Sequence, residues 1–319
     1  MKLSVLDQSP VMIDATGRDA LNASLELAVQ AEKLGFIRYW IAEHHGMEQL
    51  ASSVPEVMLS YIGTQTSHIK IGSGAILLPH YKPYKVAEIF NLLETLFPNR
   101  IDLGIGRAPG GSAEASIALS GNYLENVKKM PQLTEDLLHF IQNDFPENNM
   151  FSKLAVLPQP NHAPKVWLLG TSEKSAKQAA KLGMGYAFGH FMSDNQSSSI
   201  INSYRKEFIP SNIFDNPYCI ITVNVICSDT NEKAEEIAME SILTKINENH
   251  TQSYLDKEDK LRVKQMREKM VVGNPTKVKE QLFEIKDKNQ ADEIMIVTIT
   301  NSYETRLRSY ELIANEVFS

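Results

Sequence analysis

This 319-residue sequence has few cysteines, no excess of positive charge and no long apolar runs. Each of these features excludes a class of protein. The two cysteines, Cys219 and Cys227, would stand about 26 Å apart on a single strand, too far for a disulfide. We therefore expect free thiols and a cytoplasmic protein. The formal net charge of −7 argues against a nucleic-acid partner, because binding DNA or RNA requires a basic surface. Since no apolar run approaches a membrane span and no signal-like pattern opens the chain, no membrane partner is expected.

Short apolar stretches alternate with stretches of helical spacing along the chain, and short hairpin turns are absent. Eight such strand–helix units favour a (β/α)₈ TIM barrel over an open doubly wound sheet. No repeat or linker divides the sequence, so we predict one domain over residues 1–319, with the highly charged residues 247–270 as a mobile insertion before the last strand. The strands are predicted at residues 3–6, 37–42, 69–78, 101–105, 166–169, 186–188, 220–227 and 293–299.

Residues 98–111 combine a short buried strand with a glycine-rich turn that carries Arg107. Glycines let a backbone approach a ligand closely, and Pro109 prevents a helix from starting in the turn. Two interpretations of this stretch stand side by side: an anion site, or an arginine at the rim of the barrel. A dinucleotide fingerprint is rejected, because its third glycine, Gly110, comes one place late.

The catalytic groups of a TIM barrel follow the carboxyl ends of its strands. The run Glu43-His44-His45 lacks the spacing of a helical zinc site, and adjacent side chains on a strand point to opposite faces. We therefore expect no metal, and at most one of these two histidines facing the pocket as a general base or hydrogen-bond donor. The alternative is a rim histidine satisfied by a carbonyl. The polar residues after the predicted strands are Asp7, Gln8, Glu43, His44, His45, His80, Arg107, Thr171, Ser172, Ser175 and His190.

A second candidate anion site follows the fifth predicted strand. Thr171 and Ser172 precede a helix whose free N–H groups attract an anion, and Ser175 adds a hydroxyl one turn further on. An ordinary helix cap is the commoner role for a residue such as Ser172. Because strands four and five are neighbours in a barrel, Arg107 can converge on this helix start, which favours a phosphate site.

Five segments carry a family resemblance over almost the whole chain. They are residues 39–45 (YWIAEHH), 71–79 (IGSGAILLP), 97–107 (FPNRIDLGIGR), 169–172 (LGTS) and 291–295 (ADEIM). At these residues the chain resembles the bacterial luciferase-like flavin monooxygenases, in the single-chain branch of that superfamily. The resemblance implies a TIM barrel that binds reduced FMN or, in some members, the deazaflavin F420. It also implies that Arg107, Thr171, Ser172 and Ser175 hold the flavin phosphate.

The resemblance implies roles for three further parts of the sequence. His44 matches the family's active-site histidine, and Gly74-Ala75 matches a bulge in strand three, often with a non-proline cis peptide, against which the flavin ring packs. Residues 247–270 occupy the place of a mobile lid, and the usual assembly is a homodimer. Gly106 stands where bacterial luciferase has a reactive cysteine, so light emission is not predicted.

The leading functional hypothesis is an FMN-dependent monooxygenase that uses reduced flavin and O₂ on a small organic substrate. Without a dinucleotide fingerprint, the reduced flavin is expected from a separate flavin reductase. The alternatives are an F420-dependent oxidoreductase acting by hydride transfer, and a non-catalytic flavin-binding protein. The acidic chain favours FMN slightly over F420, whose tail carries carboxylates.

Overall fold

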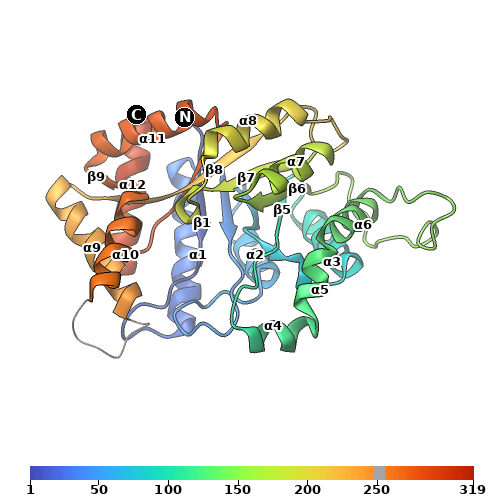
Figure 1. Cartoon of the computed structure of the whole chain (residues 1–319), viewed down its shortest axis with the longest axis horizontal. Coiled ribbons are helices and arrows are strands. Elements are labelled where there is room, and N and C mark those ends of the chain that lie inside the picture. The colour runs from blue at the N-terminus through green and yellow to red at the C-terminus, as the bar shows by residue number, and fades with distance from the viewer. Residues whose placement is uncertain (248–255) are drawn as a thin grey trace.

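Eight parallel strands close into a barrel in the computed structural model, which describes residues 1–247 and 256–319 (Figure 1). The predicted TIM barrel is confirmed, because the strand path runs around the barrel and closes where β10 pairs with both β1 and β8. The barrel strands are β1 (Leu3–Asp7), β2 (Arg38–Ile41), β3 (Lys70–Ser73) continued by β4 (Ile76–Leu77), β5 (Ile101–Gly106), β6 (Lys165–Gly170), β7 (Gly185–Gly189), β8 (Cys219–Cys227) and β10 (Glu293–Val297).

Helices surround the barrel, and local signals fix their ends. The helix α1, for example, begins at a capping box between Thr16 and Asp19 and ends at Gly35, whose φ of 90° suits glycine. The helices are α1 (Gly17–Leu34), α2 (Pro55–Gly63), η1 (Leu78–His80), α3 (Pro83–Leu96), α4 (Ala113–Ser120), α5 (Tyr123–Lys128), α6 (Met130–Gln142), α7 (Glu173–Lys181), η2 (His190–Met192), α8 (Ser197–Glu207), α9 (Asn231–Asn247), α10 (Lys257–Glu268), α11 (Pro275–Asn289) and α12 (Tyr303–Phe318).

Two strands differ from the prediction. The strand predicted at residues 69–78 is interrupted between β3 and β4, where the peptide bond between Gly74 and Ala75 is cis. The strand β8 pairs with β10 through its first half and with β9 (Met270–Gly273) through its second. The sequence analysis missed β9, because it is only four residues long and ends a highly charged segment. Both cysteines lie on β8, buried and free.

The segment expected to be a mobile insertion is described in part. Its helix α10 and its strand β9 are described, whereas residues 248–255 lie outside the described residues. Its mobility and its role as a lid therefore stay predictions. No helix in the described parts of the chain is long and apolar enough to cross a membrane.

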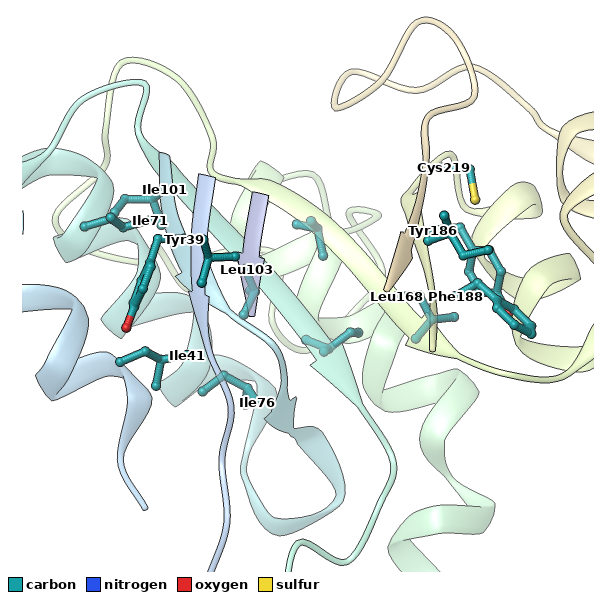
Figure 2. Packing of buried hydrophobic residues seen from close by; sticks show 14 of the residues in the cluster. Tyr39, Ile41, Ile71, Ile76, Ile101, Leu103, Leu168, Tyr186, Phe188 and Cys219 are labelled. Carbon is teal, nitrogen blue, oxygen red and sulfur yellow. The ribbon is translucent and has the colours of Figure 1, made fainter. Parts of the chain in front are cut away.

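The core lies in two layers set by the alternation of side chains along each strand. Outward-facing residues such as Tyr39, Leu103 and Phe188 pack under the helices, and Figure 2 shows part of this cluster. Inward-facing residues such as Trp40 and Trp167 fill the barrel itself. The larger apolar cluster thus fixes the helices, and the smaller one forms the floor beneath the barrel mouth.

A buried ion-pair network fills the amino-terminal end of the barrel. Arg38 pairs with Asp102 at 2.5 Å and with Glu293 at 2.6 Å, and all three side chains are at most 5% exposed. The indole N–H groups of Trp40 and Trp167 donate to Asp102 at 3.1 and 2.9 Å. Every charge in this network therefore has an oppositely charged or hydrogen-bonding partner, as burial requires.

We expect the substitution Arg38→Met to reduce the free energy of unfolding by about 3–5 kcal/mol, because it leaves two buried carboxylates without their cation. Urea denaturation monitored by circular dichroism measures the loss. The control is Arg308→Met, since Arg308 pairs with Asp229 while its side chain is 52% exposed, and this substitution should leave the free energy of unfolding nearly unchanged. Similar losses in both variants would contradict a structural role for the Arg38 network.

Candidate functional site

A cavity of about 390 Å³ opens at the carboxyl ends of the barrel strands. All seven site residues expected from the sequence line it, and they follow four different strands, β2, β3, β5 and β6. These residues are His44, Gly74, Ala75, Arg107, Thr171, Ser172 and Ser175. The structure thus brings them around one space, whereas their roles in binding and catalysis stay predictions.

Four other polar residues that follow strands are not part of the described lining: Asp7, His45, His80 and His190. Asp7 is fully buried and pairs with Arg306 of α12 at 2.5 Å, and it also accepts a hydrogen bond from Tyr39. Burial alone would raise the pKa of Asp7, but the Arg306 charge and the hydrogen bonds hold that pKa below its usual value. Asp7 therefore joins β1 to α12 and does not face the cavity.

Glu43 lines the cavity and supports its wall. Its buried carboxylate accepts hydrogen bonds from Nε2 of His45 and the hydroxyl of Tyr81, both at 2.7 Å, and from the backbone N–H of Leu77 at 3.0 Å. The bond to Leu77 holds β4 beside β2. These three hydrogen bonds stabilise the Glu43 carboxylate and link it to His45, Tyr81 and Leu77, so Glu43 fixes the position of this wall.

The wall at the break between β3 and β4 carries little side-chain bulk. A side-chain carbon at Gly74 would lie 2.7 Å from Cδ1 of Leu6, and one at Gly106 would lie 3.2 Å from Cβ of Ala75. Glycine at these positions therefore leaves a flat, apolar surface on one side of the cavity. Such a surface suits a planar ring.

His44 is a partly buried histidine at the cavity. Burial, together with the nearby charges of His45 and Lys245, lowers the pKa of His44 to about 4. Its Nδ1 atom is buried and has no hydrogen-bond partner within the described residues. At neutral pH the imidazole is therefore uncharged and available to accept or donate one proton.

The start of α7 forms another part of the cavity lining. Ser172 caps this helix: its hydroxyl accepts from the N–H of Ser175 at 3.3 Å, and its own N–H donates to the Ser175 hydroxyl at 3.3 Å. The helix-cap role that the sequence left open for Ser172 is thus present. The cap orders the helix start, whose remaining first-turn N–H groups face an incoming anion.

The sequence analysis missed Lys174, which lines the cavity together with Arg107. Within the part of the chain that the structure describes, neither cation has a carboxylate within ion-pair distance, whereas Lys177 on the same helix pairs with Glu173 at 2.9 Å. A lysine in the first turn of a helix is electrostatically unfavourable unless an anion is near. That placement, three residues after Thr171, is the sequence signal that would have identified it.

The described residues were expected to contain no metal site, and their side chains can be searched for a cluster of ligands. Among residues 1–247 and 256–319, no three His, Cys, Asp or Glu side chains are grouped so that they would hold a metal ion.

The sequence is similar to a known protein family along most of its length. The sequence model of the family described as luciferase-like monooxygenase matches residues 1–288. The Bacillus subtilis protein YceB is 38% identical over 98% of both chains. The N-acetyl-S-alkylcysteine monooxygenase of the same organism is 33% identical over 100% of this chain and 99% of its own length.

Solved structures share the same fold. The crystal structure of apo-MsnO8 superposes with a TM-score of 0.87 at 33% identity, covering 99% of this chain and 98% of that one. Two more distant structures show the fold alone. They are the oxygenating constituent of 3,6-diketocamphane monooxygenase in complex with FMN (TM-score 0.76, 20% identity, 99% and 97% coverage) and an F420-dependent secondary alcohol dehydrogenase (TM-score 0.72, 15% identity, 99% and 98% coverage).

We expect acid to destabilise the protein partly through His44. Its pKa falls from the ordinary 6.5 to about 4 on folding, so between these values the unfolded chain binds a proton that the folded chain does not. The free energy of unfolding then decreases as the pH falls through this window, by up to about 1.4 kcal/mol per pH unit for one proton. Urea titrations from pH 7 to 4 should show a shallower decrease for His44→Gln than for the wild type.

The matched control is His68→Gln at an exposed histidine, which should keep the slope of the wild type. Equal slopes for all three proteins would contradict a neutral, buried His44. Some slope remains in His44→Gln, because burial also lowers the pKa of His190.

Proposed function

The chain belongs to the luciferase-like monooxygenase family, and we propose that it is an FMN-dependent monooxygenase that uses reduced flavin and O₂ on a small organic substrate. The observation that carries the proposal is the pair of cations, Arg107 and Lys174, that line one cavity with the start of α7. A phosphate group would give both of them a counter-ion and would accept from the free N–H groups of the helix.

The remaining lining fits the rest of a flavin. The flat wall at Gly74, Ala75 and Gly106 suits the planar ring system, and the phosphate end lies at the start of α7. Thr171 lines that end, and the capping box of Ser172 and Ser175 supports it. These contacts support the assignment of Arg107, Thr171, Ser172 and Ser175 to the phosphate, with Lys174 added.

Reduced flavin would supply the two electrons for cleaving O₂, so that one oxygen atom enters the substrate and the other leaves as water. The protein's own task is then to bind, to exclude water and to move protons. The apolar wall formed by Leu6, Ala75 and Leu77 keeps water away from the reacting groups. Neutral His44 accepts or donates a proton beside them.

The choice of FMN over F420 rests on charge. The cavity is lined by two cations that have no ion-pair partner among the described residues, which matches a single phosphate, and the chain has a net charge of −7. The polycarboxylate tail of F420 would need further cations. The absorption spectrum of the bound cofactor separates the two.

The proposal includes a flavin reductase as the source of reduced FMN, a cytoplasmic location and a homodimer. Exposed apolar side chains on α2 and α3 support self-association: Val57 is 63% exposed, Tyr61 45%, Leu92 46% and Leu96 56%. The two helices pack against each other, and exposed apolar patches commonly mark interfaces.

We expect Arg107→Ala to weaken FMN binding by about one to two decades, because a hydrogen bond to a charged group contributes roughly 1.5–3 kcal/mol. Lys174→Gln should weaken it by about one decade or less, since lysine acts as a point charge without a bidentate fork. Riboflavin, which has the same ring and no phosphate, should bind both variants about as well as the wild type. Fluorescence titration with each flavin measures all the dissociation constants.

Lys177→Gln is the matched control for Lys174→Gln: it removes the same charge from the same helix, but at a residue that pairs with Glu173 and Glu207. It should leave FMN binding nearly unchanged. Equal losses for FMN and riboflavin in Arg107→Ala would show that Arg107 supports the fold or the ring, and the phosphate assignment would be wrong.

We expect His44→Ala to bind FMN normally and to slow turnover by about 10²–10⁴-fold, the usual contribution of a positioned proton-transfer group. Consumption of O₂ with chemically reduced FMN and a screened substrate gives the rate, and His68→Ala serves as the exposed control. Unchanged turnover in His44→Ala would reduce His44 to a structural residue of the rim.

A further inference from the structure

The turn that carries Arg107 is fastened to the protein at three of its carbonyl groups. The hydroxyl of Tyr123, the first residue of α5, donates to the carbonyl of Arg107 itself. Nε2 of His80 lies 2.9 Å from the carbonyl of Pro109, and the backbone N–H of His45 donates to the carbonyl of Gly110 at 2.8 Å. Since Gly106, just before Arg107, pairs with Leu77 in the sheet, the main chain is held in place before and after Arg107.

The two side-chain donors form one unit. The rings of His80 and Tyr123 are stacked, with centroids 5.1 Å apart and planes 27° apart. Since a carbonyl only accepts, the proton of His80 lies on Nε2, and Nδ1 then faces the hydroxyl of Ser120 at 3.3 Å. Burial leaves His80 only 7% exposed, so this orientation is packed from several sides.

The turn also presses against the wall of the cavity. A side-chain carbon at Gly110, whose φ is +71°, would lie 2.2 Å from Cδ1 of Leu77. A side-chain carbon at Gly111 would lie 2.1 Å from the carbonyl oxygen of His45. Glycine is thus required for the close approach that brings the turn within reach of its donors.

The Arg107 side chain itself makes no ion pair within the described residues, and it lines the cavity. A long side chain on a loose turn would lose much conformational entropy on binding an anion. Fixing the backbone at position 107 removes part of that cost before the ligand arrives. Neither His80 nor Tyr123 belongs to the described lining of the cavity, so they act through Arg107.

We propose that His80 and Tyr123 are positioning residues, which hold the Arg107 turn in the geometry that binds the phosphate. This inference rests on the proposed function, because it takes FMN as the ligand of Arg107. His80 and Tyr123 then contribute to the affinity for FMN although they lie outside the cavity, and they do not contribute to the affinity for riboflavin.

The test uses Tyr123→Phe, which removes one hydroxyl and keeps the stacked ring. We expect FMN to bind about 3- to 10-fold more weakly, corresponding to about 0.7–1.4 kcal/mol, with riboflavin binding unchanged. His80→Ala should have an effect of the same kind, and His80→Gln, which keeps a donor near the position of Nε2, should restore part of the loss. The matched control is Tyr84→Phe, which likewise removes a hydroxyl that donates to a backbone carbonyl, that of Ala155 at 3.3 Å, outside the described lining of the cavity.

A double-mutant cycle then separates positioning from general support of the fold. If Tyr123 acts through Arg107, adding Tyr123→Phe to Arg107→Ala leaves the dissociation constant of FMN where Arg107→Ala alone had put it. The four proteins are titrated with FMN, and their melting temperatures are recorded so that unfolding is not mistaken for weaker binding.

Three outcomes overturn the inference: unchanged FMN affinity in Tyr123→Phe and His80→Ala, equal losses for FMN and riboflavin, or fully additive effects of Tyr123→Phe and Arg107→Ala. Failure of the proposed function has a different signature, because it is seen in the wild type. A wild-type protein that binds riboflavin as tightly as FMN has no phosphate site. The positioning role of His80 and Tyr123 would then be wrong as well.

Discussion

Burial of the Arg38 guanidinium inside the barrel is the constraint on which the rest of the structure depends. Arg38 stands on β2, and its two carboxylate partners stand on β5 and β10, two strand positions away on either side. One cation therefore ties five consecutive strand positions of the barrel together. Because a buried charge needs its partners, an alternative strand register would leave Arg38, Asp102 or Glu293 unpaired. The network fills the amino-terminal end of the barrel, and the cavity opens at the carboxyl end.

The lining of the cavity combines two kinds of electrostatic surroundings. Within the described residues Arg107 and Lys174 have no ion-pair partner, and Lys174 stands in the first turn of α7, so the field near these cations favours an anion. Elsewhere in the lining, the carboxylate of Glu43 accepts from three donors, and His44 is neutral. The cavity therefore suits a ligand that has both an anionic group and an uncharged part.

The features that depend on short-range pattern could be predicted from the sequence. Each barrel strand is a short apolar run, and the polar residues after the runs include His44, Arg107, Thr171, Ser172 and Ser175, which line the cavity; Gly74 and Ala75 were expected from the family resemblance. The features that depend on distant partners could not. Asp7 follows a strand like a catalytic acid, but its partner Arg306 lies 299 positions along the chain. Lys174 carried a sequence signal, its place in the first turn of a helix, but only the folded arrangement shows that it lines the cavity and has no ion-pair partner within the described residues.

The burial of both cysteines on β8 would extend the lifetime of the protein if, as proposed, it uses reduced flavin and O₂. Reduced flavin that meets O₂ without substrate yields hydrogen peroxide, which attacks thiolates far faster than thiols. Burial raises the pKa of Cys227 to about 12 and also raises that of Cys219, so both sulfur atoms stay protonated and shielded. Peroxide formed in the cavity would instead meet exposed thioethers such as that of Met192, which is 63% exposed and lines the cavity. Methionine sulfoxide can be reduced back, whereas the higher oxides of cysteine are largely irreversible.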